Sequence, residues 1–332
     1  MGVQSGDRVV AYMPNIPQAL VAFLACASIG AVWSSCSPDF GSGSVVDRFK
    51  QIEPKVLFAV DGYQYGGKTF DRRETVAEIQ RALPTLEHTV VIPYLSEDPA
   101  VAAALNGSLW QSLLDAAPDA ELTYEAVPFD HPLWVLYSSG TTGLPKPIVQ
   151  GQGGILLEHI KALALQHNLK PGDRFFWFTT TGWMMWNFLI GGLLVGSTVL
   201  LYDGSPAYPD MSVLWRFAAD SKMSVFGTSA SYILSCIKAG VEPGQYDLSA
   251  LHGLGSTGSP LPVEGFLWVF EHVKPLWLAS VSGGTDVCTA FISASPLLPV
   301  RAGELQCRAL GCKVEAFDEE GRPLDDEVGE LV

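Results

Sequence analysis

Residues Leu133-Trp134-Val135-Leu136-Tyr137-Ser138-Ser139-Gly140-Thr141-Thr142-Gly143-Leu144-Pro145-Lys146-Pro147-Ile148-Val149 pass from an apolar run through a loop of small and hydroxyl-bearing residues into a second apolar run. Gly140 and Gly143 permit backbone angles that are closed to other residues, so successive N–H groups of the loop can point into one concavity. Lys146 adds a full positive charge at the rim. This combination predicts a loop that binds a polyphosphate.

The loop is not a Walker phosphate-binding loop. That motif needs Gly directly before its Lys, Ser or Thr directly after it, and then a helix. Here Pro145 and Pro147 flank Lys146, and Pro147 disfavours a helix that starts at the lysine. We therefore expect a strand, a mobile phosphate-binding turn and a second strand. The alternative is an ordinary surface turn rich in Ser, Gly and Pro.

Size and charge limit the classes of function. With 332 residues, 48% of them hydrophobic, the chain is long enough for one large or two ordinary domains. Its net charge of −15, from 35 acidic and 20 basic residues, argues against a broad surface for nucleic acid or for a membrane of anionic lipid. An anionic substrate would need local positive charge, for which Lys146 and a bound cation are candidates.

Cysteine and histidine spacing indicates a reduced, cytoplasmic protein without a zinc site. The six cysteines form no C-x-x-C pair, the six histidines form no H-E-x-x-H motif, and the first residues lack the pattern of a secretory signal. The span 175–202 has no charged residue and exceeds the length of a transmembrane helix. It contains Thr, Gly and Asn187, however, so we expect a buried strand, a loop and a buried helix.

Short apolar runs alternate with helical patterns through most of the chain. The expected strands lie near 9–13, 31–33, 55–60, 89–93, 175–178, 198–202, 225–227 and 276–282, with a further strand ending near 254. The expected helices lie near 16–29, 45–51, 72–83, 153–165, 187–194, 211–221, 230–239 and 262–272. This alternation predicts an α/β fold of largely parallel sheets that are covered by helices.

Two stretches depart from the alternation. Residues 96–129 are acidic and rich in alanine, and we expect a helical excursion there. After Pro299 the strands become short and polar, which predicts the start of a small antiparallel β region. We therefore expect an α/β core over 1–299, incomplete at its N-terminus, and a truncated β subdomain over 300–332 that stops in mid-strand.

Three loops each follow an apolar strand directly, at 138–146, 256–260 and 282–286. Ligands of open α/β sheets bind beyond the carboxyl ends of the strands, so we expect these loops to converge on one pocket. Asp286 carries the carboxylate of these loops and is a candidate to hold Mg²⁺ beside a polyphosphate. The alternative is that Asp286 caps a following helix. Thr142 and Thr285 can donate to phosphate oxygens, or can be simple turn residues.

Five ordered motifs resemble those of the adenylate-forming acyl-CoA synthetases, and the resemblance covers essentially the whole chain. They are Ser138–Lys146, Thr180-Thr181-Gly182-Trp183, Gly258-Ser259-Pro260, Gly283-Gly284-Thr285-Asp286 and Gly329-Glu330-Leu331. The resemblance implies an acid–thiol ligase with the fold of that family's large N-terminal domain. It further implies ATP, Mg²⁺ and CoA as cofactors or substrates, and an acyl-adenylate intermediate that CoA then converts to acyl-CoA.

The resemblance also implies roles for individual residues. The clasp for the β- and γ-phosphates comprises Ser138, Ser139, Gly140, Thr141, Thr142, Gly143 and Lys146. Thr285 matches the contact to the α-phosphate, and Asp286 stands where the family usually has the longer Glu, so a water can bridge it to the metal. The adenine lies between the loop of Gly258, Ser259 and Pro260 and a wall formed by Ser280, Val281 and Ser282.

The acyl pocket implied by the resemblance comprises Trp183, Met184, Met185, Thr257 and Gly283. Relatives specific for acetate have Trp in place of Gly283, so glycine there leaves room for a longer acid, with acetoacetate expected. Plain core packing is the alternative for Trp183, Met184 and Met185. Lys68, Arg72 and Arg73 could attract the 3′-phosphate of CoA, or could be the solvated start of a helix.

Some parts of the family pattern lie outside these 332 residues: a leading segment, an Asp that binds the ribose, a hinge, and a mobile domain whose lysine drives adenylation. We therefore expect the chain alone to bind nucleotide weakly and to have little ligase activity. Two other functions stay open, a ligase for another short or branched acid and a non-catalytic nucleotide-binding remnant. The expected partners are small molecules, and the sequence leaves the oligomeric state open.

Overall fold

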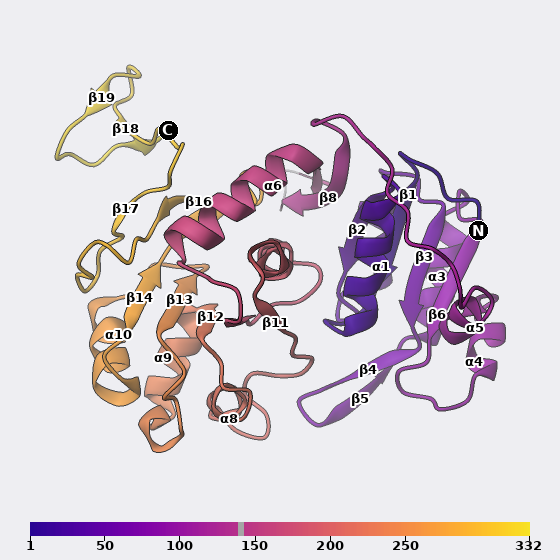
Figure 1. Cartoon of the computed structure of the whole chain (residues 1–332), viewed down its shortest axis with the longest axis horizontal. Coiled ribbons are helices and arrows are strands. Elements are labelled where there is room, and N and C mark those ends of the chain that lie inside the picture. The colour runs from indigo at the N-terminus through magenta and orange to yellow at the C-terminus, as the bar shows by residue number, and fades with distance from the viewer. Residues whose placement is uncertain (139–142) are drawn as a thin grey trace. The chain divides into compact units, whose positions relative to one another are not determined.

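The computed structural model of the chain describes residues 1–138 and 143–332, which fall into two units (Figure 1). The first unit comprises Met1–Leu157, Phe178–Ile190 and Leu200–Val213. The second unit comprises Glu158–Trp177, Gly191–Val199 and Leu214–Val332. Each unit has its own main sheet, and the two are described in turn.

A seven-stranded sheet organises the described part of the first unit, in the order β7-β6-β3-β1-β2-β8-β9. Its strands are β1 (Arg8–Tyr12), β2 (Val32–Cys36), β3 (Val56–Val60), β6 (His88–Ile92), β7 (Ser108–Leu109), β8 (Pro132–Ser138) and β9 (Lys146–Gly151). Neighbouring strands pair in parallel except for β8 and β9, which pair antiparallel. The largely parallel sheet predicted from the sequence is thus confirmed.

Helices cover both faces of this sheet, as alternating strands and helices predict. They are α1 (Pro17–Ser28), α2 (Ser42–Phe49), α3 (Arg73–Ala82), α4 (Ala100–Ala104), α5 (Trp110–Asp115) and α7 (Met184–Ile190). One face packs against apolar residues of α2, α3 and α4, including Phe49 and Ile79. On the other face, Phe23 of α1 contacts Trp33, Trp134 and Trp186. Both layers are apolar, so burial on two faces stabilises the sheet.

A hairpin of β4 (Gly62–Tyr65) and β5 (Lys68–Asp71) was not expected from the sequence. Its two-residue turn is Gly66-Gly67, and both glycines have positive φ, as hairpin turns of this length require. The Gly-Gly pair could therefore have indicated this hairpin turn in the sequence.

The stretch 96–129 contains only the short elements α4, β7 and α5, so the expected helical excursion is confirmed in part.

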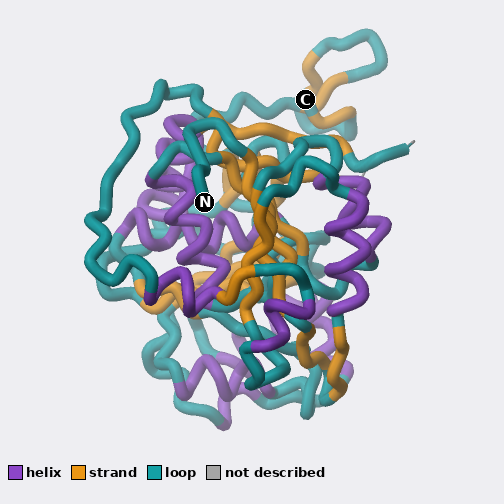
Figure 2. Tube along the Cα trace, turned by 90° about the vertical axis from the view of Figure 1, so that its right-hand side faces the viewer, coloured by secondary structure: helices purple, strands orange, loops and turns teal. Residues whose placement is uncertain are grey.

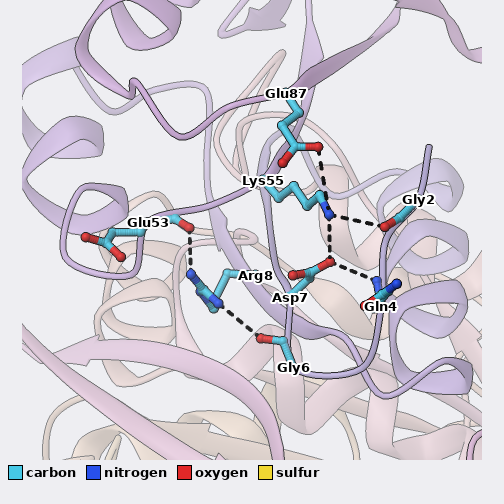
Figure 3. A network of polar contacts seen from close by, with 8 residues as sticks. All are labelled: Gly2, Gln4, Gly6, Asp7, Arg8, Glu53, Lys55 and Glu87. Carbon is cyan, nitrogen blue, oxygen red and sulfur yellow. Dashed lines mark hydrogen bonds and ion pairs between the residues drawn. The ribbon is translucent and has the colours of Figure 1, made fainter.

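Polar contacts anchor the start of the chain to the sheet (Figure 3). Lys55 Nζ lies 3.2 Å from the carbonyl oxygen of Gly2, 3.2 Å from Asp7 Oδ2 and 3.8 Å from Glu87 Oε2. Arg8 donates from its guanidinium to the carbonyl oxygen of Glu53 at 3.0 Å. The segment before β1 is thereby joined to the residues that precede β3 and β6.

The second unit is built on a five-stranded sheet in the order β11-β10-β12-β13-β14. Its strands are β10 (Arg174–Trp177), β11 (Thr198–Leu200), β12 (Val225–Ser229), β13 (Gly253–Thr257) and β14 (Trp277–Ser280). The pairs β10–β12, β12–β13 and β13–β14 are parallel. Trp177 lies over Gly227 and Gly255, where an added Cβ would come within 2.1 and 2.6 Å of the indole. Glycine at these two positions makes room for the buried ring.

Helical segments of the described second unit join and cover these strands. They are η1 (π-helix, Lys161–Gln166), which continues α6 (Gln152–Ile160), then η2 (3₁₀, Gly191–Val195), α8 (Val213–Asp220), α9 (Ala230–Lys238), η3 (3₁₀, Pro243–Gln245), α10 (Val263–Trp268) and η4 (π-helix, Val269–Val273). Trp215 of α8 contacts Phe226 of β12 and Trp268 of α10. Ser229 caps α9 by accepting a hydrogen bond from Tyr232 N at 3.1 Å.

Two small antiparallel sheets follow, in the orders β15-β16-β17 and β19-β18-β20. Their strands are β15 (Ser282–Gly284), β16 (Thr289–Ser293), β17 (Cys307–Arg308), β18 (Ala316–Phe317), β19 (Pro323–Leu324) and β20 (Glu330–Leu331). Figure 2 shows short strands connected by long loops at the C-terminal end. The predicted antiparallel region exists, but its pairing begins at Ser282 and not after residue 299. The boundary between 1–299 and 300–332 stays a prediction.

The uncharged span 175–202 contains most of β10, then α7, η2 and β11. It therefore includes the strand, the loop and the helix that were expected from the sequence. Across residues 1–138 and 143–332, the structure contains no helix long and apolar enough to cross a membrane.

Candidate functional site

The hairpin of β8 and β9 holds the two ends of the predicted phosphate loop in the first unit. Ser138 pairs with Lys146, and Tyr137 pairs with Pro147. From α2, the carbonyl oxygen of Arg48 accepts a hydrogen bond from the Tyr137 hydroxyl at 2.7 Å, and just beyond its end Gln51 Nε2 donates to the carbonyl oxygen of Pro145 at 2.9 Å. Lys146 is exposed and opens a strand, so the prediction that no helix follows the lysine is confirmed.

Four residues of the predicted clasp, Ser139, Gly140, Thr141 and Thr142, lie outside the described residues, and their role stays a prediction. Of the remaining clasp residues, Gly143 has no atom within 4 Å of the position that a Cβ would take.

A cavity of about 310 Å³ lies in the second unit, beyond the carboxyl ends of the parallel strands β13 and β14. It is lined by Thr257, Gly258, Ser259, Pro260, Leu261, Ser280, Val281, Ser282, Gly283, Gly303, Glu304 and Leu305. The structure therefore brings two of the three predicted loops to one pocket, at the edge of the sheet where ligands of α/β folds bind. Its volume is within the range of small-molecule sites.

Local chemistry fixes the two loops against each other. The Thr257 hydroxyl donates a hydrogen bond to the carbonyl oxygen of Val281 at 3.0 Å. Gly258 has a φ of 88°, in the left-handed region that favours glycine, and the chain can therefore turn sharply after β13. Ser259, Ser280 and Ser282 are among the polar residues that line the cavity.

Sequence reasoning missed the third wall of this cavity, which Gly303, Glu304 and Leu305 form. These residues lie 20 or more positions after the Ser280–Gly283 loop. The turn-forming Gly303, with a φ of 85°, was a signal for a turn but not for its location. Glu304 lines the cavity, and its Oε2 lies 3.8 Å from Nη1 of Arg301, so the carboxylate can accept from a hydroxyl or amine donor of a ligand beside a positive charge.

Thr285 and Asp286 lie in a tight turn between β15 and β16. The backbone N–H of Cys288 donates to the carbonyl oxygens of Gly284 at 3.1 Å and of Thr285 at 3.2 Å. A strand follows this turn, so the alternative that Asp286 caps a following helix is wrong. Asp286 is exposed. In the described part of the chain there is no group of three or more His, Cys, Asp or Glu side chains that could hold a metal. A single accessible carboxylate fits Mg²⁺ that takes its other ligands from phosphates and water.

Gly283 has a structural requirement of its own. The register of β15 shifts between Ser282 and Gly283, and a Cβ at Gly283 would lie 1.8 Å from the carbonyl oxygen of Thr289 and 2.6 Å from Ala290 Cα. Any side chain here must move the backbone of β15 or β16. The pairing of these strands is therefore a second reason for glycine, and the role of Gly283 in the acyl pocket stays a prediction.

Of the other predicted acyl-pocket residues, Thr257 lines the cavity at the end of β13, whereas Trp183, Met184 and Met185 lie at the start of α7 in the first unit. Met184 and Met185 are buried, while Trp183 is half-buried. The preceding Thr181 hydroxyl donates to the carbonyl oxygen of Met13 at 2.6 Å, and Trp186 Nε1 donates to Asn15 Oδ1 at 3.0 Å. Burial of the two methionines is what core packing requires, so the accessible ring of Trp183 is the stronger candidate for contact with a ligand.

The basic residues considered for CoA differ in their contacts. Arg72 donates to the carbonyl oxygen of Pro38 at 2.7 Å and lies 5.2 Å over the ring of Tyr63. Arg73 pairs with Asp71 at the start of α3. Lys68 is exposed on β5. Both arginines have structural partners, so Lys68 is the residue of the three best placed to meet a ligand.

Comparison with known proteins gives the family. A family model described as AMP-binding enzyme matches residues 1–332. This chain belongs to the AMP-binding enzymes. It is 48% identical to the acetoacetyl-coenzyme A synthetase of Rhizobium meliloti (strain 1021) over 334 residues, and 43% identical to the acetoacetyl-CoA synthetase of Gallus gallus over 341 residues. Each alignment covers 100% of this chain and 51% of the relative.

A solved structure agrees with this membership. The acetoacetyl-CoA synthetase from Streptomyces lividans matches 99% of this chain with a TM-score of 0.94 and 58% sequence identity, and the match covers 51% of that protein. The chain therefore spans about half the length of the relatives that it matches. The resemblance and the α/β fold class predicted from the sequence are both confirmed.

Proposed function

We propose that this chain contributes the nucleotide-binding and acid-binding residues of an acetoacetate–CoA ligase. The proposal rests on the cavity beyond β13 and β14. Residues from both walls of the predicted adenine site line this cavity. The names of the relatives support the choice of acetoacetate, because all the sequence relatives described above and the solved structure are acetoacetyl-CoA synthetases.

The proposed reaction has two steps. The carboxylate of acetoacetate attacks the α-phosphorus of ATP, the bond to the pyrophosphate oxygen breaks, and acetoacetyl-adenylate and pyrophosphate form. The thiol of CoA then attacks the acyl carbon, loses its proton, and displaces AMP to give acetoacetyl-CoA. Positioning of the reactants and stabilisation of charge on the phosphates are the main contributions that a protein can make to the first step.

The cavity residues have the chemistry to hold the nucleoside. The turn at Gly258-Ser259-Pro260 and the residues from Ser280 to Ser282 both line the cavity, and backbone N–H and C=O groups there can bond to a base edge. Glu304 can accept from an amino or hydroxyl group. The adenosine part of ATP or AMP is the proposed occupant.

The phosphates need positive charge, because the chain carries a net charge of −15. We assign the β- and γ-phosphates to the loop from Ser138 to Lys146 and the α-phosphate to the hydroxyl of Thr285. Mg²⁺, when bound, neutralises phosphate charge, and Asp286 would hold it directly or through a water. Asp is one methylene shorter than Glu, which favours the bridging water.

The acid and CoA sites are proposed on fewer contacts. Trp183, Met184, Met185, Thr257 and Gly283 are the proposed acyl-pocket residues, and Lys68 is the proposed contact for the 3′-phosphate of CoA. A ligase for another short or branched acid is the second candidate. A nucleotide-binding protein without catalysis is the third.

Acid-dependent exchange of pyrophosphate into ATP tests this proposal. The test protein is a hybrid in which this chain replaces the matching half of the Streptomyces lividans synthetase, to which it is 58% identical. We expect exchange with acetoacetate at least about tenfold faster than with acetate, and little exchange from the 332-residue chain alone. Faster exchange with a branched acid would favour the second candidate. No exchange by a folded hybrid with any acid would favour the third.

A further inference from the structure

A buried histidine contacts the turn that carries Thr285 and Asp286. His159 lies on α6, is 1% exposed, and has its Nε2 3.1 Å from the carbonyl oxygen of Cys288. Cys288 is fully buried and ends the turn directly before β16. The contact joins residues that are 129 positions apart in the sequence, both within the second unit.

The direction of this hydrogen bond follows from its chemistry. A carbonyl oxygen only accepts, so Nε2 of His159 must carry the proton and donate it. Burial lowers the pKa of His159 to about 4, and the ring is therefore neutral near pH 7 with its single N–H committed to Cys288. His159 is thus a fixed donor under these conditions.

Cys288 is the residue that closes the turn. Its N–H donates back to Gly284 and Thr285, and its φ of 53° lies in the left-handed region, which is uncommon for a residue with a side chain. Such a conformation persists where the surroundings fix it. The backbone of Cys288 is held on one side by the turn itself and on the other by His159.

The backbone at Gly191 approaches the other ring nitrogen of His159, Nδ1, closely. A Cβ at Gly191 would lie 2.7 Å from His159 Nδ1, so only glycine leaves room for the ring at this position of η2. Two residues after His159, Lys161 Nζ donates to Glu158 at 2.7 Å and to the carbonyl oxygen of Leu310 at 2.9 Å. The junction of α6 and η1 therefore holds both the start of β16 and the segment after β17.

We propose that His159 is a positioning residue that sets the geometry of the Thr285–Asp286 turn for the α-phosphate and its metal ion. The inference rests on the proposed function, because it takes the roles of Thr285 and Asp286 from there. His159 itself does not touch the nucleotide. It acts through Cys288, two residues after Asp286, and its loss lets the turn adopt other conformations.

Three substitutions separate the hydrogen bond from the bulk of the ring. His159→Phe keeps a ring but removes the donor, whereas His159→Gln places an amide N–H near the position of Nε2. In His159→Asn the side chain is too short to reach Cys288. This variant also lacks the hydrogen bond, and it replaces His159→Phe in the comparison if the Phe variant does not fold. His167→Phe is the matched control, since His167 is also buried and packs against Trp177 and Trp277.

Hydrogen exchange of backbone amides is the first measurement, and it needs no ligand. In His159→Phe and His159→Asn, peptides that cover residues 284–290 should exchange about tenfold faster than in the unchanged chain, with near-normal rates in His159→Gln. His167→Phe should leave this turn unchanged. Equal protection of the turn in all four variants would overturn the inference whether or not the chain binds nucleotide.

Calorimetric affinity for ATP with Mg²⁺ is the second measurement. The Phe and Asn variants should bind about tenfold more weakly, and the Gln variant should recover most of the loss. The double variant His159→Phe/Asp286→Asn should lose less binding free energy for ATP than the sum of the losses in the two single variants, because both changes act on one turn. Normal affinity in a variant whose turn has loosened would refute the positioning role. Absence of binding by the unchanged chain would instead refute the proposed function, and the role with it.

Discussion

Gly283 illustrates how one residue can satisfy a strand pairing and a proposed pocket together. A methyl group at this position would overlap the backbone of Thr289, while a Cβ at the neighbouring Gly284 meets no atom within 4 Å. The demand for glycine at position 283 therefore comes from the pairing of β15 and β16, whatever acid is bound.

This contrast predicts different costs for two adjacent substitutions. Gly283→Ala should lower the free energy of unfolding by about 2–3 kcal/mol, because a backbone atom cannot move aside as a flexible side chain can. Gly284→Ala should change it by less than about 1 kcal/mol. Urea titration of both variants measures the difference. Equal stabilities would show that β15 and β16 relax freely around an added methyl group.

Lys146 supports a prediction about binding without a change in stability. Its side chain is exposed at the first residue of β9, and we assign it to the β- and γ-phosphates. Lys146→Met should raise the dissociation constant for ATP about tenfold and leave that for AMP unchanged, since AMP lacks those phosphates. Lys313→Met, at a lysine that is 82% exposed, is the control. A matching loss for AMP would contradict the assignment.

Single residues also show what the sequence could reveal of the site. The spacing of Lys146 and its prolines was enough to predict a strand after the phosphate loop, because proline acts on its own backbone. The third wall of the cavity, at Gly303 to Leu305, was not predictable in this way. Its place depends on the return of the chain after β16, which no local pattern encodes.

Among the elements, α6 and the C-terminal end of η1 introduce buried histidines into the second unit, at His159 and at the capping residue His167. Burial lowers the pKa of His159 and of His167 to about 4, from 6.5 for an exposed histidine. Between these pKa values the unfolded chain binds more protons than the folded chain. Stability from the two neutral rings is therefore present above about pH 6.5 and is lost as the pH falls toward 4.

The resulting pH dependence can be measured by urea unfolding. From pH 7 to pH 5 we expect the free energy of unfolding to fall by on the order of 2 kcal/mol for each histidine. Substituting His167 by Phe should remove about half of the slope over this range. A slope that is the same in the variant would mean that other groups dominate the titration.

Elements also differ in how well a pattern predicted them. The long helices and buried strands followed from apolar spacing, because a helix or strand with one or two buried faces must repeat its apolar residues. The hairpin of β4 and β5 was missed although Gly66-Gly67 marks its turn, since its strands are too short and too exposed to show such spacing.

At the scale of the whole molecule, the division into two units could not be predicted from the sequence. The chain enters the first unit again at Phe178–Ile190 and at Leu200–Val213, with residues of the second unit between and around these segments. All of these segments contain apolar runs. An apolar run indicates that a segment is buried but not which sheet it packs on, and for this reason the α/β class was predictable and the assignment of segments to units was not.

Whole-molecule charge bears on ligand choice as well. With a net charge of −15, the chain should bind a neutral or singly charged nucleoside more readily than a free polyphosphate unless Mg²⁺ is present.

The central claim is that the cavity beyond β13 and β14 binds the adenosine part of an acyl-adenylate. Its most direct test is calorimetry of the 332-residue chain with a non-hydrolysable acetoacetyl-adenylate analogue, with the acetyl analogue and AMP for comparison. We predict saturable binding of the acetoacetyl analogue at least about tenfold tighter than that of either comparison ligand, and loss of binding when Gly258 is replaced by Val. Failure of the folded chain to bind any of the three ligands would contradict the claim.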